Sequence, residues 1–375
     1  MQILDRLVYT ISRVNSMESR KIQKVGYSTI TVSLPTQWVK QNNLSPGDLV
    51  FIMPERDGTL RILPGQIAQK EESEEYIINA DACDEPGMLE RIIVGSYILG
   101  RDVIRITASD RIEKSHTDEI RGIVRKLIGL GILEETPKSI LLQCSVDPTK
   151  FKLDMLIRRL SILASTILSE SMQAFLEKNT ALAEEAIDRE DEADMIYYLG
   201  VRLLLSAQRK PDIAEQIGIT DMLIIPADRL MLQYLELIAD YSEDIAKSII
   251  ELEIYRDRIP SEDIEKMCQL SELAQTIFQK AVDCIFTRDI KVANGLLEMK
   301  TVLEIESNRF MREAPEIPYL RAIVSTLNRI ADKGATIADL AINRALEEPS
   351  KYVENIIKTV KHVRTLPLPT KKKKT

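Results

Sequence analysis

The sequence predicts a multidomain, mainly α-helical protein that begins with a small β domain. The chain has 375 residues, which is more than one ordinary domain contains. Few residues are aromatic, and Leu, Ile, Ala and Glu are abundant, which favours helices over a large sheet. Alternating, turn-rich patterns occur only in the first 146 residues, and helical periodicity fills the rest. These observations predict a small N-terminal β domain, a small α+β domain and two three-helix bundles.

Composition excludes several classes of protein. The formal charge is −8 and the isoelectric point is near 5.2, so any contact with nucleic acid requires a local basic patch. The sequence has no run of about 18 apolar residues, and no transmembrane helix is expected. The cysteines show no CxxC spacing and predict reduced thiols in a cytoplasmic protein: Cys83, Cys144, Cys268 and Cys284.

The first predicted domain spans residues 17–65. Ile30, Val32 and Leu34 alternate with polar residues, which is the pattern of a half-buried strand. The expected elements are strands at 18–24 and 28–34, a helix at 36–43, and a second hairpin formed by 49–53 and 59–63. Met17 is a candidate start of translation, and residues 1–16 are otherwise expected to form a short extra helix.

Three segments of this domain resemble the AbrB/SpoVT swapped-hairpin family: RKIQKVG at 20–26, TITVSLP at 29–35 and LSPGD at 44–48. The resemblance implies a homodimer that interleaves two chains and a DNA-binding surface made by Arg20, Lys21, Lys24 and Lys40. The second strand lacks the Arg that is usual in the family, and the helix offers one cation where two are usual. The domain is therefore predicted either to bind DNA or to serve only for dimerisation.

Residues 75–146 predict a small α+β regulatory domain. Its expected strands are 76–80, 101–107 and 139–145, and its expected helices are 87–99 and 117–127. The segment contains no catalytic constellation, and ligand sensing and spacing both stay open as its role.

The remaining chain predicts two helical repeats, at 149–257 and 260–347, with an insertion in the first near 210–225. The segment at 234–240 aligns with 326–332, and 179–194 aligns with 289–304. The tail 363–375 is rich in Pro and Lys and is expected to be disordered.

Two pairs of acids in the first repeat are candidate metal ligands. Glu190 and Asp194 lie one helical turn apart and interrupt an apolar stripe, so a cation or a basic partner is expected nearby. Glu236 and Asp240 repeat this spacing on a face that also carries basic residues. Both pairs are therefore also compatible with salt-bridged helix faces that hold no metal.

The repeats resemble the PhoU family of phosphate-uptake regulators, through REDEAD at 189–194, ELIAD at 236–240 and RIAD at 329–332. The resemblance implies a carboxylate metal site of Glu190, Asp194, Glu236 and Asp240, and a second that includes Glu304 and Asp332. The positions matched to Glu190 and Glu236 are Lys300 and Asn328, so we expect the second site to be weak or empty. The resemblance implies a divalent or trivalent metal ion, and the sequence does not distinguish Mg, Mn, Fe and Zn.

These features predict a regulator of phosphate uptake rather than an enzyme. The two histidines, His116 and His362, lie in no recognised catalytic motif, and no phosphate-binding glycine loop is present. The first hypothesis is a dimeric transcriptional regulator that couples the metal-binding body to its DNA-binding domain. The alternative is a DNA-free adaptor that docks on the ATPase subunit of a phosphate ABC transporter and restrains uptake.

Overall fold

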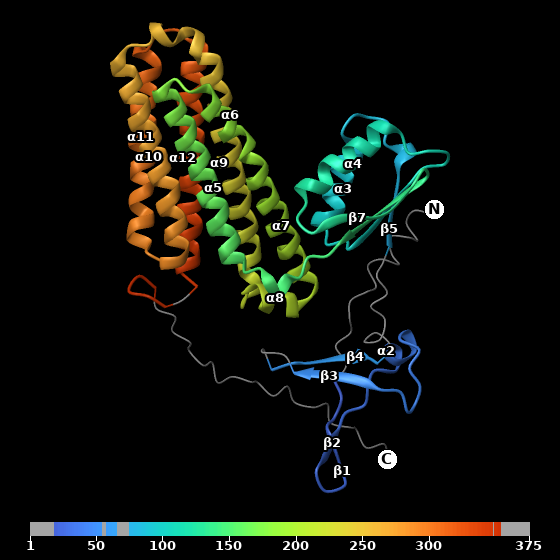
Figure 1. Cartoon of the computed structure of the whole chain (residues 1–375). Coiled ribbons are helices and arrows are strands. Elements are labelled where there is room, and N and C mark those ends of the chain that lie inside the picture. The colour runs from blue at the N-terminus through green and yellow to red at the C-terminus, as the bar shows by residue number, and fades with distance from the viewer. Residues whose placement is uncertain (1–18, 55–57, 66–74, 348, 354–375) are drawn as a thin grey trace, which may run out of the picture. The chain divides into compact units, whose positions relative to one another are not determined.

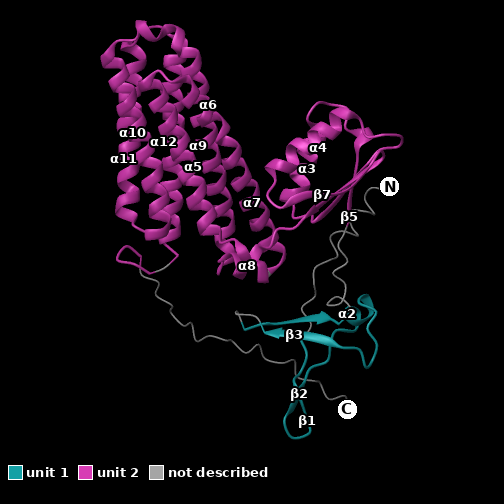
Figure 2. Ribbon diagram, viewed as in Figure 1, with its two compact units in different colours: residues 1–73 teal, residues 74–375 magenta. Residues whose placement is uncertain are grey.

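The computed structural model describes residues 19–54, 58–65, 75–347 and 349–353. The chain forms two compact units, Met1–Ser73 and Glu74–Thr375 (Figure 2), and we call the first unit the head. The expectations for residues 1–16 and for the tail 363–375 lie outside the described residues. Within the described residues, no helix is long and apolar enough to cross a membrane.

The head contains two antiparallel hairpins and one short helix, close to the expected positions. β1 (Gln23–Val25) pairs with β2 (Thr29–Thr31), α2 (Thr36–Gln41) follows, and β3 (Val50–Pro54) pairs with β4 (Leu60–Pro64). Gly26 takes a positive φ of 66° in the first turn, a conformation that glycine adopts without strain.

The head of a single chain leaves most apolar side chains of its strands exposed. Ile30 and Val32, predicted to line the inner face of a half-buried strand, are 62% and 50% exposed. Phe51 and Ile52 in β3 are exposed as well. The alternation along this segment is real, but a unit with strands this short has no layer of its own to cover them.

The second unit begins with an α+β domain. Its elements are β5 (Glu75–Asn79), α3 (Met88–Ile98), β6 (Val103–Thr107), α4 (Lys114–Lys126), β7 (Leu130–Thr136) and β8 (Ser139–Cys144). The sheet order is β5-β6-β8-β7, with β5 and β6 parallel and the other pairs antiparallel. Strand β7 was missing from the sequence-based prediction. Its outer half, Glu134–Glu135–Thr136, is polar and exposed, so it lacks the apolar pattern of a buried strand.

The first helical repeat contains three long helices and a broken segment. α5 (Leu153–Glu177) is followed by α6 (Thr180–Asp188) and α7 (Glu190–Arg209). α6 and α7 are separated by a break at Arg189, whereas a three-helix bundle implies one continuous helix here. The predicted insertion forms α8 (Pro211–Ile217) and a 3₁₀ turn at Met222–Ile224. α9 (Ile225–Leu252) completes the repeat.

The second repeat consists of α10 (Ser261–Thr287), α11 (Ile290–Glu313) and α12 (Pro318–Ala345), as the sequence predicts. α9 packs against α12 and α5 against α10, and one continuous hydrophobic core contains residues of both repeats. Within the second repeat, Gly334 permits a close approach of α12 to α10, because a Cβ there would lie 2.9 Å from backbone atoms of Phe278. The two repeats therefore form one helical body (Figure 1).

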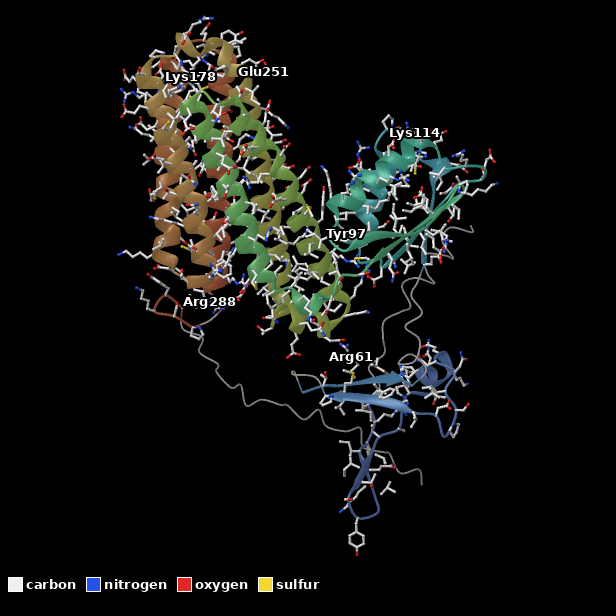
Figure 3. All side chains as sticks on the ribbon, in the orientation of Figure 1. Arg61, Tyr97, Lys114, Lys178, Glu251 and Arg288 are labelled. Atoms are coloured by element: carbon white, nitrogen blue, oxygen red, sulfur yellow. The ribbon has the colours of Figure 1, made fainter. Side chains whose placement is uncertain are left out.

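Equivalent positions in the two repeats have equivalent structures. Lys178 and Arg288 end the first helix of each repeat with φ of 54° and 55°. The next residues, Asn179 and Asp289, both cap the following helix with a side-chain oxygen. Figure 3 shows Lys178 and Arg288 at opposite ends of the body, so the two repeats run in opposite directions.

Candidate functional site

The helices of the first repeat bring the two predicted acid pairs together. Glu190 and Asp194 lie in the first two turns of α7, and Glu236 and Asp240 lie in the middle of α9, which packs against α7. The helical spacing directs both members of each pair to one face, as predicted. We call these four residues the carboxylate cluster.

The electrostatic surroundings show that the four side chains influence one another. Burial, followed by the charges of Asp194 and Asp240, raises the pKa of Glu190 to about 8. Burial and the same two aspartates raise the pKa of Glu236 to about 8. The pKa of Asp240 is raised to about 6 by burial and by Asp194, and that of Asp194 is raised mainly by burial. All four side chains are half-buried rather than fully solvated, which differs from the solvated face considered for Glu236 and Asp240.

One edge of the cluster is held by a hydrogen-bonded network. Gln233 donates through Nε2 to Glu236 Oε2 at 2.6 Å, and its Oε1 accepts from Tyr197 Oη at 2.7 Å. Arg229 donates through Nη2 to Tyr197 Oη at 3.0 Å. The guanidinium is thus directed at the tyrosine and the glutamine rather than at a carboxylate of the cluster. The network orients Glu236 without neutralising the cluster.

Other ion pairs next to the cluster involve neighbouring acids. Lys247 pairs with Glu243 at 2.7 Å, and Lys126 pairs with Asp191 at 2.5 Å. Arg189 forms a two-pronged pair with Glu170, at 2.8 and 3.0 Å. None of these three ion pairs ends on one of the four cluster carboxylates, so protons or a bound cation are needed to balance the charge of the cluster at neutral pH.

At the matched positions of the second repeat, a lysine side chain balances the charge of the acids. Lys300 Nζ lies 2.8 Å from Glu304 Oε2 and 3.0 Å from Asp332 Oδ1. Glu304 and Asp332 therefore lie close together, as the aligned repeat predicts, but the lysine ammonium lies between them. The residues here do not suit a metal cation, because the ammonium supplies the positive charge and Asn328 replaces one acid.

The donor set of the first repeat suits a hard cation. Four carboxylates from two helices offer only oxygen ligands, which is the preference of Mg²⁺, Mn²⁺ and iron rather than of soft metals. Among the residues that the structure describes, no three or more His, Cys, Asp or Glu side chains are arranged as a ready metal-holding group. Metal binding would therefore require small rotamer changes that bring the carboxylate oxygens of the cluster to a common point.

The predicted DNA-binding residues lie in the head. Arg20, Lys21, Lys24 and Lys40 are all exposed, and Lys24 belongs to β1 while Lys40 belongs to α2. Residues 17–65 contain six Lys and Arg against four Asp and Glu, a net charge of +2, whereas the whole chain carries −8. The head is thus a locally basic part of an acidic protein.

Sequence reasoning missed the contribution of Lys126 to the surroundings of the cluster. This residue ends α4 of the α+β domain, 65 positions from its partner Asp191. A basic residue in the last turn of a helix is common, and nothing in the sequence says that α4 packs beside α7. Glu243, one turn beyond Asp240, could have been found from helical spacing alone.

The α+β domain contains a cavity of about 470 Å³ beyond the carboxyl ends of β5 and β6. Its wall includes Asp84, Glu85 and Arg111. Glu119 also lines it and accepts hydrogen bonds from the backbone amides of Gly87 and Glu90 at the start of α3. A carboxylate of the protein thus already occupies the helix N-terminus.

The architecture defines a helical-repeat protein with a carboxylate-rich face. Residues 157–249 match the PhoU domain family. The matched segment includes all four members of the carboxylate cluster. The match agrees with the resemblance to PhoU proteins that the sequence shows at these positions. The match does not reach the head, whose resemblance to AbrB/SpoVT proteins stays a prediction.

The solved structures that are similar to the chain include that of a PhoU protein. It is the crystal structure of the phosphate transport system regulatory protein PhoU from Streptococcus pneumoniae, with 18% sequence identity and a TM-score of 0.42. The similarity covers 52% of this chain and 94% of the PhoU chain. A comparison with curated protein sequences gave no match.

Proposed function

We propose that the protein is a metal-dependent regulator of phosphate uptake, and that its carboxylate cluster is the metal site. The observation that carries this proposal is the cluster itself: four half-buried acids, whose charges raise the pKa values of Glu190 and Glu236, inside the segment that matches the PhoU domain. A cation bound there offsets the repulsion that otherwise raises the pKa values of Glu190 and Glu236. Glu190, Asp194, Glu236 and Asp240 would hold the metal, and the hydrogen bond from Gln233 would orient Glu236.

The head is proposed to pair two chains and to bind DNA. Its exposed apolar side chains, including Ile30 and Phe51, support pairing, because a second copy would remove them from water. Its net positive charge and the exposed cations Arg20, Lys21, Lys24 and Lys40 support contact with phosphates. The body would then regulate a promoter through the geometry of the two heads, because the spacing of half-sites governs dimer binding.

Binding of the purified protein to DNA from upstream of phosphate-transporter genes tests this function. Affinity is measured across a salt series against scrambled DNA, for the full chain and for a variant that carries Lys21→Gln and Lys24→Gln. Matched changes at Lys291 and Lys351, which are exposed residues of the body, serve as the control. Specific binding that weakens only in the head variant supports a DNA-binding regulator. Equal affinity for both DNAs, or equal loss in the control, contradicts it.

The alternative function is an adaptor that binds the ATPase subunit of a phosphate transporter, with a head that only dimerises. The match to the PhoU domain lies in the helical body rather than in the head, and it supports a role that the body performs by itself. Co-purification of the ATPase with the protein, together with no preference for promoter DNA, would support the adaptor and exclude the promoter-binding role.

A further inference from the structure

The α+β domain is anchored on α7, the helix that carries Glu190 and Asp194. Arg202, which is 5% exposed, donates through Nη1 to the carbonyl oxygen of Tyr97 at 2.6 Å and to that of Arg101 at 3.2 Å. Its other amino group pairs with Asp102. In Figure 3, Tyr97 lies on the side of the α+β domain that faces the helical body. This buried arginine makes the C-terminal half of α7 a firm attachment for the domain.

A second attachment is made at the other end of α7, beside the carboxylate cluster. Lys126, the last residue of α4, approaches Asp191 to 2.5 Å between Nζ and Oδ1. Its positive charge also lowers the pKa of Asp194, while Asp194 and Glu190 raise the pKa of Lys126. The ammonium thus interacts with the cluster although it belongs to another domain.

The two attachments differ in strength. The side chains of Lys126 and Asp191 are 40% and 54% exposed, and exposed ion pairs of this kind contribute little to stability and are screened by salt. Arg202 is buried and bonds to two backbone carbonyls, so its loss would leave unsatisfied polar groups. A change of charge at the cluster would therefore release the contact of Lys126 and leave the contact of Arg202 in place.

We propose that Lys126, paired with Asp191 beside the carboxylate cluster, competes with a metal ion for this acidic site, and that metal binding displaces the lysine and frees the α4 edge of the α+β domain to move about Arg202. This inference rests on the proposed metal site and adds its regulation. A metal ion brings two or more positive charges close to the ammonium, which changes the attraction between Lys126 and the acids into repulsion. Metal binding is thus coupled to the position of the α+β domain through the side chain of Lys126.

Because coupling between two binding events is reciprocal, Lys126 must oppose the metal as much as the metal opposes Lys126. Lys126→Met removes the competing charge and keeps much of the apolar length of the side chain. We expect the variant to bind Mn²⁺ about 3- to 10-fold more tightly than the unchanged protein, near the lower end of typical coupling. Arg125→Met is the matched control, because Arg125 precedes Lys126 on the same helix and is exposed.

The test measures Mn²⁺ affinity by calorimetry on full-length, chelator-treated protein, and amide hydrogen exchange in the last turn of α4. In the unchanged protein, Mn²⁺ should accelerate this exchange. In Lys126→Met the exchange should already be fast without metal, and Mn²⁺ should not change it. Exchange within α5, whose helix the change does not touch, reports whether the variant is folded.

Three other outcomes have distinct meanings. If the unchanged protein binds no Mn²⁺ and no Mg²⁺ or Fe²⁺, the proposed metal site and this inference are both overturned. If it binds metal and the two variants have the same affinity, the metal site stands and the role of Lys126 is overturned. If affinity changes as expected but exchange in α4 does not, Lys126 only tunes the site and the proposed movement is excluded.

Discussion

The two repeats provide a reciprocal exchange that tests the chemistry of the carboxylate cluster. Glu190 in the first repeat corresponds to Lys300 in the second, where the ammonium lies between Glu304 and Asp332. Glu190→Lys should therefore give the first repeat the charge balance of the second, stabilising the metal-free protein at neutral pH and eliminating metal binding. Lys300→Glu should have the opposite effect on stability.

The expected stabilisation by Glu190→Lys follows from the pKa of Glu190 in the folded protein. A rise from 4.5 to about 8 corresponds to an upper limit of roughly 5 kcal/mol in a fully buried site. Glu190 is only half-buried and lies in the first turn of α7, where the helix dipole favours a negative charge, so we expect about 1–2 kcal/mol at pH 8. That free energy corresponds to an increase in melting temperature of about 2–8 °C for a helical body of this size.

The pH dependence has a definite sign. Between about pH 4.5 and pH 8, folded Glu190 holds a proton that the unfolded chain has lost, so the metal-free protein loses stability as pH rises through this window. Glu190→Lys should remove much of that decline, and at pH 4 it should give no gain, because Glu190 is then neutral in both states. Metal binding to the unchanged protein should release protons in the same window.

Thermal unfolding of chelator-treated protein at pH 4, 6 and 8 measures these quantities. Glu185→Lys makes the same change of charge at an exposed position of α6, and Lys291→Glu makes the reverse change at an exposed position of α11. Neither control should alter the pH dependence. An unchanged or lower melting temperature for Glu190→Lys at pH 8, with a native circular dichroism spectrum, would show that repulsion in the cluster does not limit stability.

Three further variants test the packing, the buried ion pair and the head. Gly334→Ala should lower the free energy of unfolding in urea by about 1–3 kcal/mol, because its Cβ would lie 2.9 Å from the backbone of α10. Gly295→Ala, which has nothing within 4 Å, should instead stabilise the protein by about 0.5–1 kcal/mol. Equal effects of the two substitutions would contradict the close approach at Gly334. Arg344→Met removes the partner 2.9 Å from Asp228, which is 2% exposed, and should cost about 3–5 kcal/mol at pH 7. Because burial already raises the pKa of Asp228 to about 6, the loss should be smaller at pH 5, and a pH-independent loss would refute this explanation. Phe51→Asp should convert a dimer to a monomer in sedimentation analysis, and an unchanged mass would place the pairing surface elsewhere.

The positions of most elements followed from local patterns. Helix breaks fell where Pro and capping residues occur, as at Lys210–Pro211 and Ile259–Pro260, since these limits depend on neighbouring residues only. Matching segments around 234–240 and 326–332 revealed the repeat. Their equivalent apolar residues, among them Ala239 and Ala331, are fully buried. Strand β7 was missed because its polar half is defined by pairing with β8, a contact that alternation does not encode.

For the site, the sequence established which acids share a helix face, because the helical period fixes that relation. Helical spacing placed Glu190 with Asp194 and Glu236 with Asp240, and the alignment identified Lys300 as the departure in the second repeat. Sequence alone left open whether the two pairs were solvated faces or one cluster. That choice depends on how deeply α7 and α9 pack against each other, and the raised pKa values are a consequence of that packing.

The sequence by itself thus determined the helical repeats, their junctions and the residue types available for a metal. Only the tertiary structure decided that the two acid pairs meet, that Lys300 neutralises the equivalent acids, and that Lys126 reaches Asp191 from a different domain. The physical reason is range. Caps, turns and periodicity depend on residues within about one helical turn. Charge balance depends instead on distances between side chains that are far apart in the sequence, such as Lys126 and Asp191, which are 65 positions apart.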